Sequence, residues 1–134
     1  MDTYYIDGKF VQENMAQIPA QDITVLRGFG VFDFFITYNK RPFFIKEHVA
    51  RLESSARQVG LTLLHSNQEI CDIVVQTIEK NPHHTESNVR IVYTGGISPD
   101  SVTPQENGIL MVIVTPKDQL PSWWFTRGIK IITI

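Results

Sequence analysis

The chain has 134 residues, of which 43% are hydrophobic and 19% are charged, and its formal net charge at pH 7 is −2. This composition supports a single domain with a real hydrophobic core and leaves too little chain for two domains. Because the charges nearly balance, the chain offers no basic surface for nucleic acid and no polybasic segment for a membrane, so neither is an expected partner. The single cysteine, Cys71, excludes a disulfide within the chain, and we expect a reducing, cytoplasmic setting.

Two β-hairpins are expected at the start of the chain. Residues 4–6 and 9–11 are rich in aromatic and β-branched side chains, and the Asp7-Gly8 pair between them favours a tight two-residue turn. Residues 30–38 are almost all aromatic or β-branched, which predicts a largely buried strand. The sequence Asn-Lys-Arg-Pro at 39–42 then predicts a turn into a partner strand at 43–45.

Two amphipathic helices are expected to follow the hairpins. Apolar residues recur at spacings of four and three from Ile45 to Val59, and Gly60 provides a stop, so the first helix should cover residues 46–59. Ser66 and Glu69 have the spacing of a capping box, in which each side chain satisfies a backbone N–H at the helix start. An apolar face follows this pair up to Asn81-Pro82, so the second helix should cover residues 67–80.

The remaining sequence has the pattern of three further strands. Residues 89–94 alternate with period two, residues 108–115 form a nearly continuous apolar run, and residues 128–134 repeat a strand pattern. Hairpin turns without alternation of strands and helices favour an α+β fold, a two-layer sandwich with two helices on one face of a mostly antiparallel sheet. Since residues 128–134 lack a turn or polar tail to finish the strand, we expect the chain to be a fragment of a longer protein.

Two sequence motifs connect the chain to a known family. The pattern D-R-G-x-x-Y/F-G-D-G-V-F-E lies without gaps on residues 22–33, DITVLRGFGVFD, and H-x-x-R-L-x-x-S-A lies on residues 48–56, HVARLESSA. On these motifs the chain resembles the N-terminal domain of the class IV, fold-type IV enzymes, which depend on pyridoxal phosphate (PLP). This group contains branched-chain aminotransferases, D-amino-acid aminotransferases and aminodeoxychorismate lyases, and the resemblance extends over essentially the whole chain.

The resemblance places five residues around the cofactor. Arg51 occupies the position of an arginine that contacts the cofactor phosphate, whose oxygens match the planar fork of a guanidinium. Arg27, Phe32 and Phe34 occupy positions that line the substrate side, and Arg90 falls where branched-chain aminotransferases carry a pocket arginine. For four of these residues the sequence also allows a structural alternative, namely a surface arginine for Arg51 and Arg90 and a core side chain for Phe32 and Phe34.

Two polar residues of the same motifs are expected to be structural. We interpret His48 as a packing or hydrogen-bonding histidine, and Asp33, where the family usually has glutamate, as compatible with a solvated strand residue. With no partner assigned to Arg51, its replacement is expected to weaken cofactor retention with little change in the fold.

Departures from the family pattern leave the substrate undetermined. Ile36 and Asn88 replace an arginine and a tyrosine of the branched-chain enzymes, and Gly95 stands where D-amino-acid aminotransferases bind the substrate carboxylate with an arginine. The family's reaction also needs a lysine that holds the cofactor covalently and moves a proton, and in the family this lysine belongs to a second domain. None of the six lysines here has that sequence context, so no catalytic residue and no metal ligand is assigned.

The resemblance therefore implies the N-terminal domain of a homodimeric, PLP-dependent enzyme that transfers an amino group between an amino acid and a 2-oxo acid. The 134-residue chain alone should be inactive and should bind PLP weakly or not at all. Two alternatives stay open. One is an aminodeoxychorismate-lyase-like enzyme, which uses the same cofactor to eliminate pyruvate, and the other is a stand-alone, non-catalytic binding domain.

Overall fold

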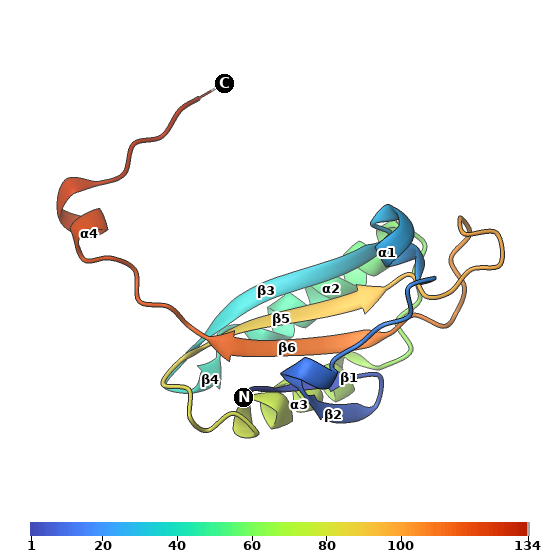
Figure 1. The fold of residues 1–134 in the computed structure, drawn as a ribbon, viewed down its shortest axis with the longest axis horizontal. Coiled ribbons are helices and arrows are strands. Elements are labelled where there is room, and N and C mark those ends of the chain that lie inside the picture. Colours follow the sequence, from blue (N-terminus) through green and yellow to red (C-terminus); the bar gives the residue numbers. More distant parts are fainter. Residues whose placement is uncertain (134) are drawn as a thin grey trace.

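The computed structural model describes residues 1–133, which form a two-layer α+β fold (Figure 1). A six-stranded sheet has the order β2-β1-β6-β5-β3-β4, and its neighbouring strands are antiparallel. The strands are β1 (Thr3–Ile6), β2 (Lys9–Gln12), β3 (Gly30–Tyr38), β4 (Arg41–Pro42), β5 (Ser87–Thr94) and β6 (Leu110–Pro116). The helices are η1 (Glu13–Met15), α1 (Ile23–Arg27), α2 (Ile45–Gln58), α3 (Asn67–Glu79) and α4 (Trp123–Arg127). The two longest helices cover one face of the sheet, which confirms the predicted fold class.

The hydrophobic core lies between the sheet and helices α2 and α3. Along β3, Val31 and Phe35 are buried on the helix side, whereas Phe32 and Phe34 are exposed on the opposite face. This alternation follows from the period of two in a strand, and it decides which candidate residues are available at the surface. The helices contribute Val49, Leu52 and Ala56 from α2 and Ile70, Val74 and Ile78 from α3.

Both long helices begin and end within one residue of the predicted bounds. The capping box of α3 is present, since the backbone N–H of Ser66 donates to Glu69 at 2.7 Å and the backbone N–H of Glu69 donates to the Ser66 hydroxyl at 3.3 Å. Gly60 follows α2 with φ +78°, the left-handed conformation that ends helices. Local sequence signals were sufficient to predict these helix bounds, because the capping box and the helix-ending glycine each act within one helical turn.

The second hairpin differs from its prediction. The turn consists only of Asn39 and Lys40, whose φ angles of 50° and 59° are those of a type I′ turn, so Arg41 and Pro42 already form β4. Residues 43–45 are not a strand, because Phe44 has φ 45° and caps α2, which begins at Ile45. As β4 pairs only with Thr37 and Tyr38, residues 30–36 of β3 have no strand on their outer side within the described residues.

Helix α1 was not predicted from the sequence. It is capped by Asp22, and it lies close to the backbone at Gly30 and Gly95. Asp22 accepts a hydrogen bond from the backbone N–H of Thr24 at 2.8 Å, which caps the N-terminus of this short helix. A Cβ atom at Gly95 would lie 2.5 Å from Ile23, and one at Gly30 would lie 2.9 Å from the Thr24 hydroxyl. The absence of side chains at these glycines lets α1 pack directly against the ends of β3 and β5.

The C-terminal segment also corrects a prediction. Residues 128–133 form no strand, and α4 and the chain that follows it extend away from the sheet (Figure 1). Ile131 and Ile132 are exposed, so the apolar pattern of this segment has no neighbouring strand to complete a ladder. Ile134, the last residue of the predicted strand, lies outside the described residues. None of the described helices is long and apolar enough to cross a membrane.

Candidate functional site

Arg51 is held by a buried carboxylate. Its Nε donates to Asp33 Oδ2 at 2.7 Å, and its Nη2 donates to Asp33 Oδ1 at 2.6 Å, which gives a bidentate ion pair between α2 and β3. His48, one helical turn earlier, places Nδ1 2.9 Å from Asp33 Oδ1, and its ring stacks on Phe35. The side chain of Asp33 is 1% exposed and that of Arg51 is 65% exposed. The guanidinium is therefore fixed on its inner side and open to solvent on its outer side.

The environment of Asp33 keeps it ionised. Burial opposes ionisation of this carboxyl, but hydrogen bonds from Arg51, His48 and the backbone N–H of Phe34 outweigh the cost, so the pKa of Asp33 lies below its ordinary value. A pKa that is lower in the folded than in the unfolded chain stabilises the fold at neutral pH, and this contribution is lost as the pH falls below about 4. The expectation that Asp33 could be a solvated strand residue is wrong.

This pairing changes what replacement of Arg51 would do. The sequence alone predicts little change in the fold, but the guanidinium provides two of the hydrogen bonds that satisfy a buried carboxylate. The sequence carried a signal that Asp33 is buried. Side chains alternate between the two faces of a strand, so Asp33 shares the face of Val31 and Phe35, which the helices cover. His48 has the structural, hydrogen-bonding position expected of it.

Phe32, Phe34 and Arg90 lie together on the face of the sheet that α2 and α3 leave open. The two phenylalanines are 65% and 42% exposed, so neither is a core side chain. The guanidinium carbon of Arg90 lies 5.8 Å from the centroid of each ring, which places a cation between two aromatic faces. Because Phe34 pairs with Arg90 across β3 and β5, the sheet register itself produces this cluster.

Two hollows border the Arg90 side chain. One of about 430 Å³ lies between α1 and the open sheet face and is lined by Thr24, Gly28, Gly30, Val31, Phe32, Arg90 and Val92. A smaller one of about 150 Å³ is lined by Phe34, Asn88, Arg90, Ile113 and Thr115. Arg90 belongs to both, so a carboxylate in either hollow could pair with its guanidinium.

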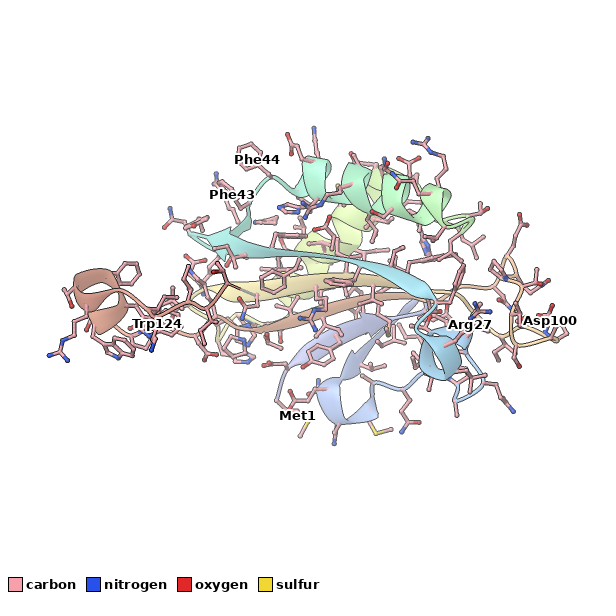
Figure 2. The ribbon with its side chains drawn as sticks, turned by 90° about the horizontal axis from the view of Figure 1, so that it is seen from above. Met1, Arg27, Phe43, Phe44, Asp100 and Trp124 are labelled. Carbon is pink, nitrogen blue, oxygen red and sulfur yellow. The ribbon has the colours of Figure 1, made fainter. Side chains whose placement is uncertain are left out.

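Arg27 lies near this cluster but does not line either hollow. It is the last residue of α1, on the side of the sheet away from α2 (Figure 2). Its guanidinium donates to the backbone carbonyl of Val102 at 3.3 Å and lies 5.7 Å from the ring of Phe29. These contacts tie α1 to the loop that contains Asp100, and they place Arg27 at the rim of the candidate site.

The phosphate-side and substrate-side candidates lie on opposite faces of β3. Arg51 is on the helix side with Asp33, whereas Phe32 and Arg90 are on the open side. The two faces meet at the outer edge of β3, which β4 does not cover at residues 30–36. The backbone N–H of Phe34 donates to Asp33 Oδ1 at 2.6 Å at this edge. A ligand that contacts both arginines has to lie along the uncovered edge.

The described residues fit the two ends of a PLP–substrate pair but not its covalent anchor. Arg51 is a fixed cation of the kind that can pair with a phosphate, and the Arg90 guanidinium could pair with a carboxylate, while no lysine lines either hollow among residues 1–133. Lys40 donates to the carbonyl of Pro82 at 2.8 Å, and Lys80 and Lys117 lie over the rings of Phe10 and Tyr38. These lysines are engaged away from the Arg90 cluster.

Comparison with known proteins identifies the family. The model of the amino-transferase class IV family matches residues 30–130. A protein of Methanocaldococcus jannaschii, provisionally named a branched-chain-amino-acid aminotransferase, is 30% identical over 132 residues, which are 97% of this chain and 44% of that protein. The D-alanine aminotransferase of Staphylococcus epidermidis is 26% identical over 136 residues, covering 99% of this chain and 48% of that enzyme. A solved structure, the PLP-bound form of a hypothetical aminotransferase from Mycobacterium tuberculosis, has a TM-score of 0.73 at 23% identity and covers 92% of this chain and 42% of that one.

Both comparisons of sequence run over nearly the whole chain, although the chain spans less than half the length of these relatives. The family model covers the strand that carries Phe32 and Asp33, the helix that carries His48 and Arg51, and the strand that carries Arg90. The chain belongs to the class IV aminotransferase family.

Proposed function

We propose that this chain is the N-terminal domain of a PLP-dependent aminotransferase similar to the branched-chain enzymes. The whole protein would exchange an amino group between an amino acid and a 2-oxo acid, in the cytoplasm, where the single buried thiol of Cys71 stays reduced. The observation that carries this proposal is the pair of positioned cations, Arg51 and Arg90, on the two sides of the uncovered edge of β3. Their two partners would be the cofactor phosphate and the substrate carboxylate.

Each residue of the proposed site has a physical role. Asp33 and His48 orient Arg51, whose Nη1 makes no hydrogen bond among residues 1–133 and can donate to a phosphate oxygen. Arg90 would pair with the substrate carboxylate, and Phe32 and Phe34 would form an apolar wall that excludes water from the reacting carbon. Arg27 would close the rim. When bound, PLP supplies the electron sink for the reaction.

We further propose that the lysine that anchors the cofactor lies outside these 134 residues, in a second domain. Two observations support this proposal. No lysine among residues 1–133 lines either hollow, and the chain spans less than half the length of its relatives. The same absence favours a second candidate function, a domain that binds a phosphorylated or carboxylate ligand without catalysis. The chain alone would then bind PLP weakly, because Arg51 is the one phosphate contact it is proposed to offer.

The cofactor assignment is tested on the whole protein. Purified after expression with its complete reading frame, it should be yellow, with an absorption band that borohydride removes, because reduction destroys the conjugated link between cofactor and lysine. A colourless protein that stays colourless after incubation with PLP would exclude the transferase and favour the binding domain. Assays with amino acids plus 2-oxoglutarate, and separately with aminodeoxychorismate, distinguish transfer from lyase chemistry.

We also propose that the protein is a homodimer that covers the open face around Phe32. The 134-residue chain should therefore self-associate, and light scattering across a concentration series should give a mass of at least a dimer. Phe32→Glu should shift the mass towards the monomer, whereas Leu64→Glu, a change at a similarly exposed leucine between α2 and α3, should not. A monomer mass at every concentration would contradict the proposal. Pairing of two chains through residues 128–133 does not support the homodimer, since these residues form no strand.

A further inference from the structure

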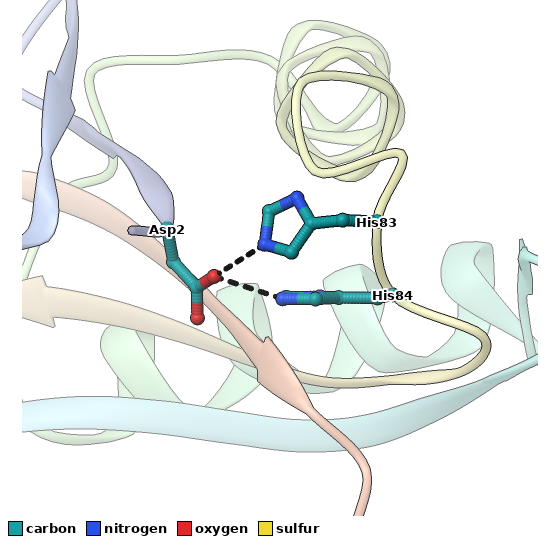
Figure 3. Close-up of side chains that lie close together, drawn as sticks. All are labelled: Asp2, His83 and His84. Atoms are coloured by element: carbon teal, nitrogen blue, oxygen red, sulfur yellow. Dashed lines mark hydrogen bonds and ion pairs between the residues drawn. The ribbon is translucent and has the colours of Figure 1, made fainter.

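A second cluster of chemically active side chains connects the N-terminus with the turn between α3 and β5 (Figure 3). Asp2 Oδ1 lies 2.9 Å from Nε2 of His83 and 2.9 Å from Nε2 of His84. All three of these atoms lie within 4.8 Å of one another. A carboxylate oxygen and two imidazole nitrogens that converge in this way are a donor set used by zinc and related divalent metal ions.

The polypeptide around the cluster is held in place by independent hydrogen bonds. The backbone N–H of Glu13 donates to the carbonyl of Asp2 at 2.9 Å. The side-chain amide of Asn81 accepts from the N–H of Thr3 and donates to its carbonyl, at 2.8 Å in both cases. The N–H of His84 donates to the carbonyl of Asn81 at 3.1 Å. Both halves of the cluster are therefore positioned by contacts that a bound metal would not need to make.

Ser87 provides the outer contact that metal-binding histidines usually have. Its hydroxyl lies 3.0 Å from Nδ1 of His84, and both residues are buried. In the metal-free chain Nε2 of His84 carries the proton that it donates to Asp2. A bound ion would replace this proton, and Nδ1–H would then donate to the Ser87 hydroxyl, which is the tautomer that a metal requires. This contact also fixes the orientation of the ring.

The accessibility of the cluster suits a bound ion. The side chain of His84 is 2% exposed, whereas that of His83 is 51% exposed. An ion can therefore enter from the side of His83.

A bound ion would require the ligand atoms to shift. Zinc at about 2.0 to 2.2 Å from each ligand separates tetrahedral ligand atoms by about 3.4 Å, so each hydrogen-bonded pair of atoms must move apart by about 0.5 Å. The two Nε2 atoms, which lie within 4.8 Å of one another, must reach the same separation. Rotation of the half-exposed His83 side chain can provide this movement.

We propose that Asp2, His83 and His84 bind a divalent transition metal of the zinc class, with water completing the coordination, and that the ion links β1 to the α3–β5 turn. Its role would be structural, because the cluster lies at the Ser87 end of β5, whereas the larger hollow near Arg90 lies towards the Thr94 end. The ion would join residues more than 80 positions apart in the sequence, and any binding to the folded chain alone stabilises the fold.

The experiment uses the 134-residue chain without a histidine tag, after removal of metals with a chelator. Calorimetric titration with zinc chloride should give one site per chain, zinc should raise the melting temperature, and cobalt should produce the visible absorption of a low-symmetry N/O site. Ser87→Ala should weaken zinc binding about 10-fold or more. His83→Gln, which removes a ligand rather than its partner, should weaken it further. His83 is half-exposed, so its replacement should leave the fold intact.

Two controls make the outcome decisive. Asp2→Asn keeps the size of the side chain and a hydrogen-bond acceptor but removes the charge, and it should lose zinc binding while circular dichroism stays unchanged. His65→Gln removes a histidine from outside the cluster and should leave zinc affinity unaltered. Failure of the original chain to bind zinc, nickel or cobalt at micromolar concentrations would overturn the proposal. So would a zinc affinity of the His83→Gln and Asp2→Asn variants that equals the affinity of the original chain.

Discussion

Replacing Arg51 with alanine should both destabilise the domain and weaken cofactor retention in the whole protein. The melting temperature of the 134-residue chain should fall by about 4–12 °C, because the buried carboxylate of Asp33 loses two charged hydrogen-bond donors. PLP retention in the whole protein should fall about 10- to 100-fold, as expected for loss of a hydrogen bond between a guanidinium and a phosphate. Thermal melts and equilibrium dialysis against PLP measure the two effects.

The two effects are separated by a double-mutant cycle with Asp33. Asp33→Asn removes the charge that Arg51 neutralises, so Arg51→Ala should cost less stability when combined with Asp33→Asn than it costs alone. Cofactor retention should behave differently, because the phosphate contact requires Arg51 itself in either background. If Arg51→Ala lowers stability but leaves PLP retention unchanged, Arg51 is only the partner of Asp33 and the phosphate role is wrong. If Arg51→Ala lowers neither stability nor PLP retention, the ion pair between Arg51 and Asp33 also contributes nothing measurable to the stability of the domain.

Replacing Arg90 with glutamine should raise the KM for the amino acid substrate of the whole protein by about 10- to 100-fold. The guanidinium carbon lies 5.8 Å from the centroids of the Phe32 and Phe34 rings, and a neutral amide cannot form the charged pair with a carboxylate. The stability of the domain should change little, because Arg90 is exposed and its contacts with the two rings are weak. Steady-state kinetics and thermal melts measure these quantities.

The matched control for Arg90 is Arg57→Gln. Arg57 belongs to α2, on the covered side of the sheet. Its replacement with glutamine removes the same net charge as Arg90→Gln. It should leave the KM unchanged, so an equal effect of both variants would indicate long-range electrostatics rather than a contact. A normal KM in Arg90→Gln would show that the substrate carboxylate is bound elsewhere, and neither hollow beside Arg90 would then be its binding site.

Short-range sequence signals determined most of the secondary structure. The Asp7-Gly8 pair forms the predicted turn, and Ser66 with Glu69 starts α3 as predicted, because each of these signals acts between residues that are close in sequence. The period of two along β3 separates Phe32 and Phe34 from Asp33, but it did not tell which of the two faces the helices cover. The order of hairpins and helices was enough for the α+β class, and the two motifs were enough for the family.

Contacts between distant segments decided the rest, because no local pattern encodes the neighbour that a side chain will meet. The period of residues 128–133 suits a strand, yet they form none, since a strand exists only where another strand completes its hydrogen bonds. Helix α1 is too short to be recognised from periodicity, and it packs closely because Gly30 and Gly95 have no side chains. The ion pair between Asp33 and Arg51 depends on how α2 crosses β3, which is why an arginine expected to be dispensable for folding satisfies a buried charge.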